Sequence, residues 1–383
     1  DENGGLSDDD LVDFESGNPE FIDRSVFDPL FENAENELRG KRFHLDHSYI
    51  LVKPNDSLKK SQLTIGNIVN YKDKYYQFKQ SSQNSYFGDA FNNSINDKVK
   101  LEDFYAEGNI KFNHKTIGKL KTFIGYNNFN YGYDKLVLLE DNTITNRLKG
   151  NAIMAGGSYS NKIAKINIYG KFGINVTGDR DANYINGVAS YNINEDYSFK
   201  AGININSKPP NYNYLLYQSD YINYNWQNSF ENVQSKQFNA VVASNKFGSL
   251  NFDYTTINNY TYFLSNDEGN VKPFQTDNTV NYVRVKYNNE IKAGKFALNN
   301  TLRYQKVLDG EGMLNVPEFV TRNTIYYSNH FFEKKALFLQ TGVTFNYFTS
   351  YNMDAFDPVL GEFYAQNETE IGGFPRLDFF INA

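Results

Sequence analysis

The sequence contains no cysteine, so disulfide bridges and thiolate-based metal or redox chemistry are excluded. Histidine is also scarce, and Trp226 is the only tryptophan. No run of about 18 apolar residues is present, so the sequence offers no candidate transmembrane helix. The first ten residues, DENGGLSDDD, do not resemble a signal peptide, and a secreted protein would have to be seen here already processed or cut.

Aliphatic residues are few relative to aromatic ones. Only 40% of the 383 residues are apolar, and much of that fraction is Tyr (30) and Phe (32). A soluble core of this size would be expected to draw mainly on Leu, Ile and Val. The composition therefore favours an architecture whose apolar side chains do not mainly pack a soluble core.

Charge is unevenly distributed along the chain. Residues 1–38 hold 13 acidic side chains and one basic one, Arg24, a balance of −12, whereas the other 345 residues hold 37 basic and 32 acidic side chains, a balance of +5. An acidic amino-terminal segment thus precedes a mildly basic body.

Alternation with a period of two predicts about 15 β-strands. In residues 162–176, KIAKINIYGKFGINV, alternate positions are apolar or small and polar residues such as Lys171 lie between them. Most of the predicted strands have 11 to 17 residues, whereas soluble strands usually have about 5 or 6. The predicted strands are 41–53, 61–80, 101–113, 116–132, 147–160, 162–176, 183–194, 196–208, 234–245, 248–263, 278–289, 292–306, 321–332, 335–348 and 373–383.

The connections between these strands alternate between short and long. Short turns are predicted at 54–60, 113–115, 160–161, 194–196, 245–248, 288–291 and 332–335. Longer segments are predicted at 81–100, 133–146, 177–182, 209–233, 264–277, 307–320 and 349–372. Tight periplasmic turns that alternate with long external loops are typical of up-and-down outer-membrane barrels.

The sequence therefore predicts an all-β, antiparallel, up-and-down transmembrane outer-membrane β-barrel, with one barrel domain over 1–383. Residues 1–40 would form an acidic extracellular loop and 41–383 the strands and their loops. A soluble β-sandwich or propeller is the rival fold, but its strands are shorter and nothing forces its connections to alternate. Fifteen is an odd number, so we expect 16 or more strands in a complete barrel and an incomplete chain at both ends.

In such a barrel the apolar face of each strand meets lipid and the polar face lines the lumen. Ile166, Ile168, Phe172 and Ile174 would then face lipid. Tyr and Phe gather in 71–78, 126–133, 258–263 and 345–351, where aromatic girdles at the two membrane interfaces would place them. The alternative explanation is the general preference of aromatic residues for strands.

Several segments resemble the putative porin family of Bacteroidota outer membranes, a Flavobacterium-like outer-membrane β-barrel. They are ENGGLSDDDLVDFESGNPEFIDR (2–24), GKRFHLDHSYIL (40–51), NYNYLLYQSDYINYNWQNSF (211–230) and FYAQNETEIGGFPRLDFFINA (363–383). The resemblance covers essentially the whole chain. It implies a bacterial outer-membrane location, with further strands before the first segment and at least a hairpin after the last, and it carries no catalytic residues to transfer.

The polar faces predict a lumen lining with a basic bias. Its basic members are Lys119, Lys121, Lys165, Lys171, Lys200, Arg284, Lys286, Lys295 and Arg303, and its acidic members are Asp46, Asp103, Glu107 and Asp253. Charged linings stabilise counter-ions and so tune ion selectivity. We therefore expect passive diffusion of small hydrophilic solutes with a mild preference for anions.

A second hypothesis is a structural or accessory barrel that its own loops close, acting as a subunit of a larger secretion or nutrient-uptake complex. The expected partners are outer-membrane lipid and lipopolysaccharide, and other outer-membrane proteins under this second hypothesis. Nucleic acid is not expected, because no basic patch supports its binding.

Enzymatic and cofactor chemistry find little support in the sequence. His44 and Asp46 share one strand face and His47 lies on the other, which favours a lumenal hydrogen-bonded pair over a metal site. The enzymatic alternative is an outer-membrane phospholipase or protease, in which a nucleophile and a histidine lie on the barrel wall. The acidic run with Asp8, Asp10 and Asp13 lacks the register of a calcium-binding EF-hand loop, so a solvated loop is expected, with opportunistic Ca²⁺ binding as the alternative.

Overall fold

The computed structural model describes residues 12, 13, 16, 20, 33–53, 61–139, 142–266 and 269–383. The predicted turn at 54–60 and most of the predicted acidic loop, including Asp8 and Asp10, lie outside these residues. In the described part of the chain, no helix is long and apolar enough to cross a membrane.

Fifteen long strands pair in one antiparallel sheet, in the order of the chain, which confirms the predicted fold class. The ten other strand numbers belong to short strands inside the long connections. The sheet runs β1 (Ala34–Val52), β2 (Ser61–Gln80), β3 (Ile95–His114), β4 (Gly118–Tyr133), β7 (Arg147–Ile163), β8 (Ile166–Gly178), β9 (Asn183–Asn192), β10 (Tyr197–Lys208), β13 (Val233–Ser244), β14 (Gly248–Asn258), β17 (Val280–Ala293), β18 (Phe296–Asp309), β19 (Phe319–Phe331), β20 (Leu337–Phe348) and β25 (Arg376–Asn382).

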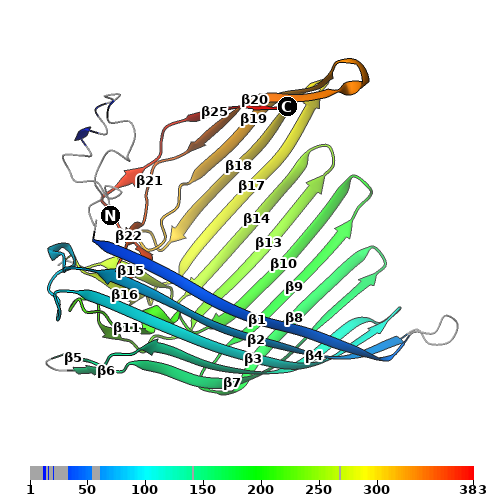
Figure 1. The fold of residues 1–383 in the computed structure, drawn as a ribbon. Helices are drawn as coiled ribbons and strands as arrows, with labels where there is room; N and C mark the ends of the chain where they lie inside the picture. Colours follow the sequence, from blue (N-terminus) through cyan, green and yellow to red (C-terminus); the bar gives the residue numbers. More distant parts are fainter. Residues whose placement is uncertain are drawn as a thin grey trace.

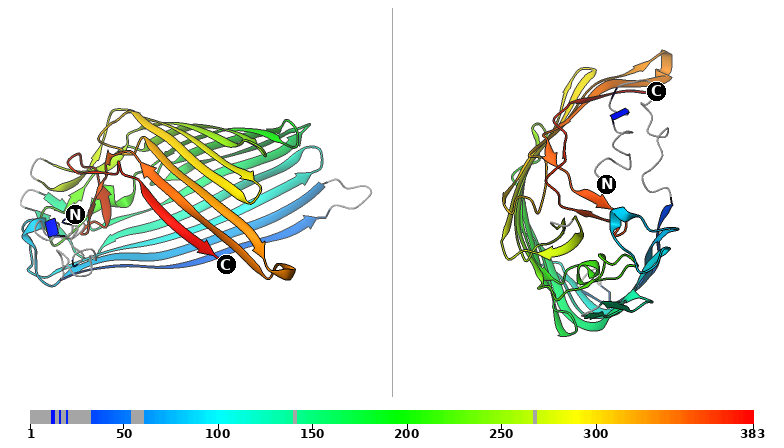
Figure 2. Two further views of the ribbon diagram at one scale, coloured as in Figure 1. Left: turned by 90° about the horizontal axis from the view of Figure 1, so that it is seen from above. Right: turned by 90° about the vertical axis from the view of Figure 1, so that its left-hand side faces the viewer.

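The sheet curves strongly around a hollow, with β1 and β25 at its two edges (Figures 1 and 2). Tight turns gather at one end, at the right of Figure 1, and the longer connections gather at the other. Seen from the loop end, these connections fold into the concave side of the sheet (Figure 2). The predicted alternation of short and long connections is therefore confirmed at both ends.

The long connections contain secondary structure of their own. The short elements are η3 (Ser85–Phe87), β5 (Val137–Leu139), β6 (Asn142–Ile144), α2 (Tyr212–Leu215), β11 (Leu216–Tyr217), β12 (Trp226–Gln227), β15 (Thr261–Ser265), β16 (Val271–Gln275), β21 (Tyr351–Asn352), β22 (Ala355–Asp357), β23 (Glu362–Tyr364) and β24 (Glu370–Ile371). A further short helix, η4 (Glu333–Lys335), lies in the turn between β19 and β20. Hairpins such as β15–β16 give the loops enough backbone pairing to hold a defined shape.

Several predicted boundaries were wrong. β1 begins at Ala34, so residues 34–40 form strand and not acidic loop. The turn after β7 lies at Ala164 and Lys165 instead of 160–161, and the turn after β17 lies at Gly294 and Lys295 instead of 288–291. Ala164 takes a left-handed conformation with φ of 54°, which glycine and asparagine usually supply, so the sequence has no turn signal there.

Candidate functional site: the lumen face and the loop core

The register of the sheet assigns each strand residue to one of two faces, because Cα partners on neighbouring strands point to the same side. The lumen face is the concave side, onto which the loops fold. Phe78 of β2, Ile95 of β3 and Tyr131 of β4 lie on it, since they are buried against the loops. The other side of the sheet is the outer face.

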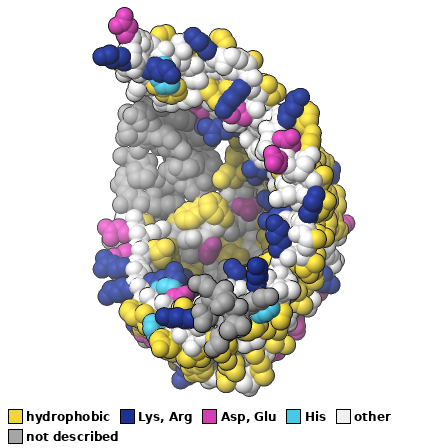
Figure 3. Space-filling model, turned by 90° about the vertical axis from the view of Figure 1, so that its right-hand side faces the viewer, with side chains coloured by type: hydrophobic (Ala, Val, Ile, Leu, Met, Phe, Trp, Pro, Cys, Tyr) yellow, Lys and Arg dark blue, Asp and Glu magenta, His cyan; other side chains and the backbone are white. Residues whose placement is uncertain are grey.

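The outer face carries exposed apolar side chains along every strand from β4 to β10. On β8, Ile166, Ile168, Phe172 and Ile174 are exposed, as the alternation predicts. Figure 3 looks into the hollow from the end opposite the loops, with hydrophobic side chains along the outer edge and charged ones within. An apolar outer face around a polar interior suits a sheet surrounded by lipid.

Above this apolar zone, toward the loops, the outer face becomes charged. Phe43 of β1 pairs with Tyr71 of β2, which pairs with Phe104 of β3, so the three form one aromatic row. Beyond that row β1, β2 and β3 continue to the loop end with charged residues, among them Lys41, Asp73, Glu102, Arg39 and Lys100. The change from aromatic to charged residues marks a membrane interface on this wall.

Most of the predicted lining residues lie on the lumen face, as their pairing shows. Lys121 of β4 pairs with Ser158 of β7, which pairs with Lys171 of β8. The predicted residues that share this face are Asp46, Asp103, Glu107, Lys119, Lys121, Lys171, Lys200, Asp253, Arg284, Lys286 and Arg303.

Two predicted lining residues do not lie on a strand. Lys165 and Lys295 each occupy the second position of a two-residue turn at the end opposite the loops. Their assignment to the wall was wrong because the alternation was continued through each turn.

Further basic residues that were not predicted also lie on the lumen face, among them Arg42, Lys72, Lys74, Lys111 and Arg322. The alternation places each of them on the polar face of its strand, so the same reading that found Lys121 could have found them.

The acidic lining residues are largely held by basic neighbours. Glu107 lies 2.5 Å from Lys121 Nζ and Asp253 lies 2.8 Å from Arg284 Nη2. Asp103 lies farther, at 4.0 Å, from Lys72 Nζ.

Lys286 and Arg303 stand directly opposite each other on β17 and β18. Among the described side chains neither has an acidic partner within 4.0 Å, and Arg303 Nε is buried without a hydrogen-bond acceptor. Asp253, the carboxylate on the neighbouring strand β14, is already engaged by Nε and Nη2 of Arg284. Two like charges that face each other repel unless an anion lies between them, so this part of the wall carries uncompensated positive charge.

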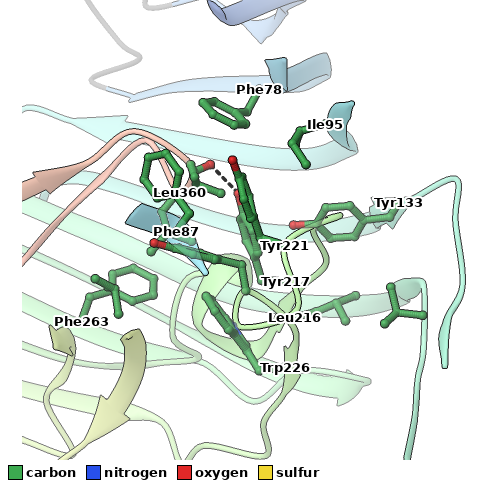
Figure 4. Close-up of a cluster of buried hydrophobic side chains, with 14 of the residues drawn as sticks. Phe78, Phe87, Ile95, Tyr133, Leu216, Tyr217, Tyr221, Trp226, Phe263 and Leu360 are labelled. Carbon is green, nitrogen blue, oxygen red and sulfur yellow. Dashed lines mark hydrogen bonds between the residues drawn. The ribbon is translucent and has the colours of Figure 1, made fainter. Parts of the chain in front are cut away.

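A cluster of buried apolar side chains, here called the loop core, lies at the loop end of the hollow (Figure 4). It joins the inward faces of β2, β3 and β4 to five of the long connections, those after β2, β4, β10, β14 and β20. Its members are Phe78, Phe87, Ile95, Tyr131, Tyr133, Val137, Ile144, Leu216, Tyr217, Tyr221, Tyr224, Trp226, Phe263, Val271, Ala355, Val359, Leu360 and Tyr364.

The loop core explains much of the aromatic richness of the sequence. Phe78, Tyr131, Tyr133 and Phe263 belong to segments in which girdles were predicted, yet all four are buried in the loop core. Tyr71 does lie on the outer face near the interface. The girdle prediction therefore holds for only part of these clusters, because successive strand residues face opposite sides.

Buried carboxylates tie the loops to the strands around the loop core. Asp97 of β3 accepts hydrogen bonds from Ser219 Oγ and, at 2.8 Å, from the backbone N of Asp220. Asp220 in turn forms an ion pair of 2.6 Å with Lys135. These groups line a cavity of about 500 Å³ between the connections after β2, β4 and β10.

The predicted hydrogen-bonded pair of His44 and Asp46 is not formed, and two of the three acidic residues considered for calcium, Asp8 and Asp10, lie outside the described residues. His44 Nδ1 lies 2.6 Å from Asn70 Oδ1, so its hydrogen bond goes to the neighbouring strand and not to Asp46. Asp13 is exposed, and its backbone oxygen accepts a hydrogen bond from Ser16 Oγ at 2.6 Å. In the described parts of the chain no three His, Asp or Glu side chains gather as metal ligands.

A family model described as Putative porin matches residues 1–383. The chain belongs to this family. No curated protein matches the chain. Membership and fold together place the protein in the bacterial outer membrane, as the sequence predicted.

Solved outer-membrane structures share the fold at low sequence identity. The copper transporter OprC matches with a TM-score of 0.58 and 12% identity over 91% of this chain and 57% of its own. The ferric enterobactin receptor of Pseudomonas aeruginosa (Q482A mutant with enterobactin) matches with a TM-score of 0.56 and 11% identity, over 84% of this chain and 53% of its own. The porin-family chain thus spans a little over half the length of these structures.

Proposed function

We propose that this chain forms the wall of a passive diffusion pathway for small hydrophilic solutes, with a mild preference for anions. Membership of the porin family and a polar, charged lumen face support the pathway. The similar structures named as a receptor and a transporter agree with a transport role. The proposed partners are outer-membrane lipid and lipopolysaccharide outside and the solutes within.

The anion preference depends on one observation, the opposed Lys286 and Arg303. Asp253 is nearby but its charge is balanced by Arg284. A fixed positive charge raises the local concentration of anions within about a Debye length, roughly 8 Å at physiological salt. In a narrow lumen bounded by protein this bias would affect every ion that passes.

Reversal potentials in planar bilayers under a salt gradient test this proposal. We expect the sign of an anion-selective pore, with an anion-to-cation permeability ratio modestly above one. A cation-selective potential would contradict the preference, whereas a protein that never conducts would contradict the pathway itself.

The loop core favours a second candidate, a structural or accessory barrel in a larger envelope assembly. Its 18 buried residues hold five connections within the hollow, where they obstruct part of the lumen. Under this candidate the purified protein does not conduct and co-purifies at fixed stoichiometry with another outer-membrane protein. Conductance without such a partner would favour the diffusion pathway.

A further inference from the structure

Three of the lumen-face aromatic side chains outside the loop core belong to strands β3, β4 and β9, and none of the three takes part in an ion pair. They are Tyr105 of β3, Phe123 of β4 and Tyr184 of β9, and each is partly exposed. Together with the glycines described next, they form what we call the aromatic shelf. Large lumen-facing rings in the middle of a polar wall require an explanation beyond strand propensity.

Each ring lies across a lumen-facing glycine of a neighbouring strand. A Cβ atom added to Gly156 would lie 2.7 Å from two ring carbons of Phe123, and one added to Gly173 would lie 2.5 Å from Cε1 of Tyr184. A Cβ atom on Gly125 would likewise lie 2.7 Å from Tyr105 Oη. The rings therefore extend along the wall instead of standing upright in the lumen.

The register brings two of the rings toward each other. Phe123 pairs with Gly156, Gly156 pairs with Gly173 and Gly173 pairs with Tyr184, so the four residues form one row across four strands. Three strand spacings of about 4.8 Å separate the two aromatic residues, about 14 Å in all. The glycines between them leave the wall free of side chains, and both rings reach inward over that gap.

Not every glycine in this part of the sheet has a side chain across it. On the outer face of the same part of the sheet, Gly108 of β3 has nothing within 4 Å of an added Cβ, and Gly170 of β8 has only a backbone oxygen. Glycines of this sheet can thus lie uncovered, whereas the three on this part of the lumen face each have a ring across them.

Charged and polar groups surround the shelf. Lys121 Nζ lies 5.3 Å from the centroid of Phe123, and Lys171 Nζ lies 5.6 Å from that of Tyr184. Glu107 is buried and accepts hydrogen bonds from Tyr105 Oη at 2.8 Å and from Lys121 at 2.5 Å. Lys121 is thus neutralised by Glu107, and Lys171, which is exposed, supplies the free positive charge.

We propose that the aromatic shelf is a binding station for saccharides that carry an anionic group, such as a carboxylate or a phosphate. The apolar C–H face of a sugar ring packs on an aromatic face, while its hydroxyl groups hydrogen-bond to polar side chains at the edge of the ring. Lys171 binds the anionic group. This inference rests on the proposed diffusion pathway, because the solute has to enter the lumen.

Ion current through the protein in planar bilayers tests the shelf. Glucuronate and glucose 6-phosphate, added separately, should interrupt the current transiently at lower concentration than glucose does. The double variant F123L/Y184L retains apolar volume over the glycines but removes both rings, so we expect its half-blocking concentration to rise about tenfold with ion conductance retained. The matched control is Tyr282→Leu, because Tyr282 is a lumen-facing tyrosine of β17 outside the shelf. The saccharides should block the current through this variant at the same concentrations as through the native protein.

Several outcomes would overturn the inference. If the half-blocking concentrations are equal for the native protein and F123L/Y184L, the rings do not bind the saccharide. If glucose and both acids block the current at equal concentrations, the anionic group plays no part in binding. Block by only one acid assigns the site to carboxylate or to phosphate. If the native protein does not conduct, the diffusion pathway is contradicted, and calorimetry with glucuronate on the detergent-solubilised protein then tests binding at the shelf. Binding by the native protein that F123L/Y184L loses would support the shelf as a binding station. No binding by the native protein would overturn it.

Discussion

Trp226 stacks on Tyr217 in the loop core, with ring centroids 5.0 Å apart and an angle of 23° between the planes. Trp226 Nε1 donates to the backbone oxygen of Asn213 at 2.8 Å, and Tyr217 Oη donates to that of Val359 at 2.6 Å. The stack therefore joins the connection after β10 to the connection after β20, which are far apart in the sequence. The loops depend on this junction, whereas the strands have their own backbone pairing.

Trp226→Ala should destabilise the loop core by about 3 to 5 kcal/mol, the usual cost of removing a large buried aromatic side chain. The barrel should remain folded, because the ladder of the sheet does not include Trp226. Proteolysis of the loops measures the first effect, and heat-dependent mobility on a denaturing gel measures the second. Phe363→Ala, at a side chain that is 55% exposed, is the control and should change neither.

The loop core should be more stable in mild acid than at alkaline pH. Asp357 is buried and accepts hydrogen bonds from Tyr224 Oη at 2.7 Å and from the backbone N of Leu360 at 3.0 Å. Burial raises the pKa of Asp357 and, to the same effect, that of Glu362. The folded loops thus keep protons that unfolded loops release, so this stability is complete below the ordinary carboxyl pKa of about 4 and is lost as the pH rises through the raised values.

Fluorescence of the single tryptophan, Trp226, during urea unfolding measures this dependence. We expect the urea concentration at the midpoint of the loop transition to decrease as the pH is raised from 5 to 8. Asp357→Asn should make this decrease smaller. Glu368→Gln, at an exposed loop position, should leave the pH profile unaltered. A midpoint that rises with pH would contradict the assigned direction.

Replacing Lys286 and Arg303 by Gln should move the reversal potential toward cation selectivity. A single charge about 8 Å from a passing ion in water contributes roughly 0.5 kcal/mol, so we expect about a twofold change in permeability ratio for each charge removed. Lys98→Gln, on the outer face of β3 and above the aromatic row, should have no effect. Asp253→Asn frees Arg284 and should shift the potential in the opposite direction.

A charge on the outer face should destabilise the barrel according to its depth. Ile124 of β4 is 66% exposed and lies midway along the apolar outer row of its strand. Ile124→Arg should cost about 2 to 4 kcal/mol, and Ile168→Arg, close to the turn after β7, should cost about 1 kcal/mol or less. Unfolding in lipid vesicles measures both. Lys171→Gln on the lumen face should leave stability within about 0.5 kcal/mol, and an equal loss for all three would contradict the assignment of faces.

Alternation predicted the strands well and their ends less well. The prediction of 61–80 coincides with β2, because both ends of that strand meet polar segments. The turns at Ala164 and Gly294 were misplaced, because polar and apolar residues continue to alternate through them. Two-residue turns add too few residues to interrupt a pattern of period two, so Lys165 and Lys295 were assigned to the wall.

The sequence by itself determined the strand number, the two faces of each strand and the rhythm of the connections, since each depends on residues close together in the chain. Only the tertiary structure decided which aromatic side chains lie on the outer face and which are buried in the loop core. Tyr224 meets Asp357, 133 residues away, and Tyr76 Oη donates to the backbone oxygen of Pro358 at 2.8 Å. Such contacts follow from how the curved sheet brings its loops together, and no local pattern records them.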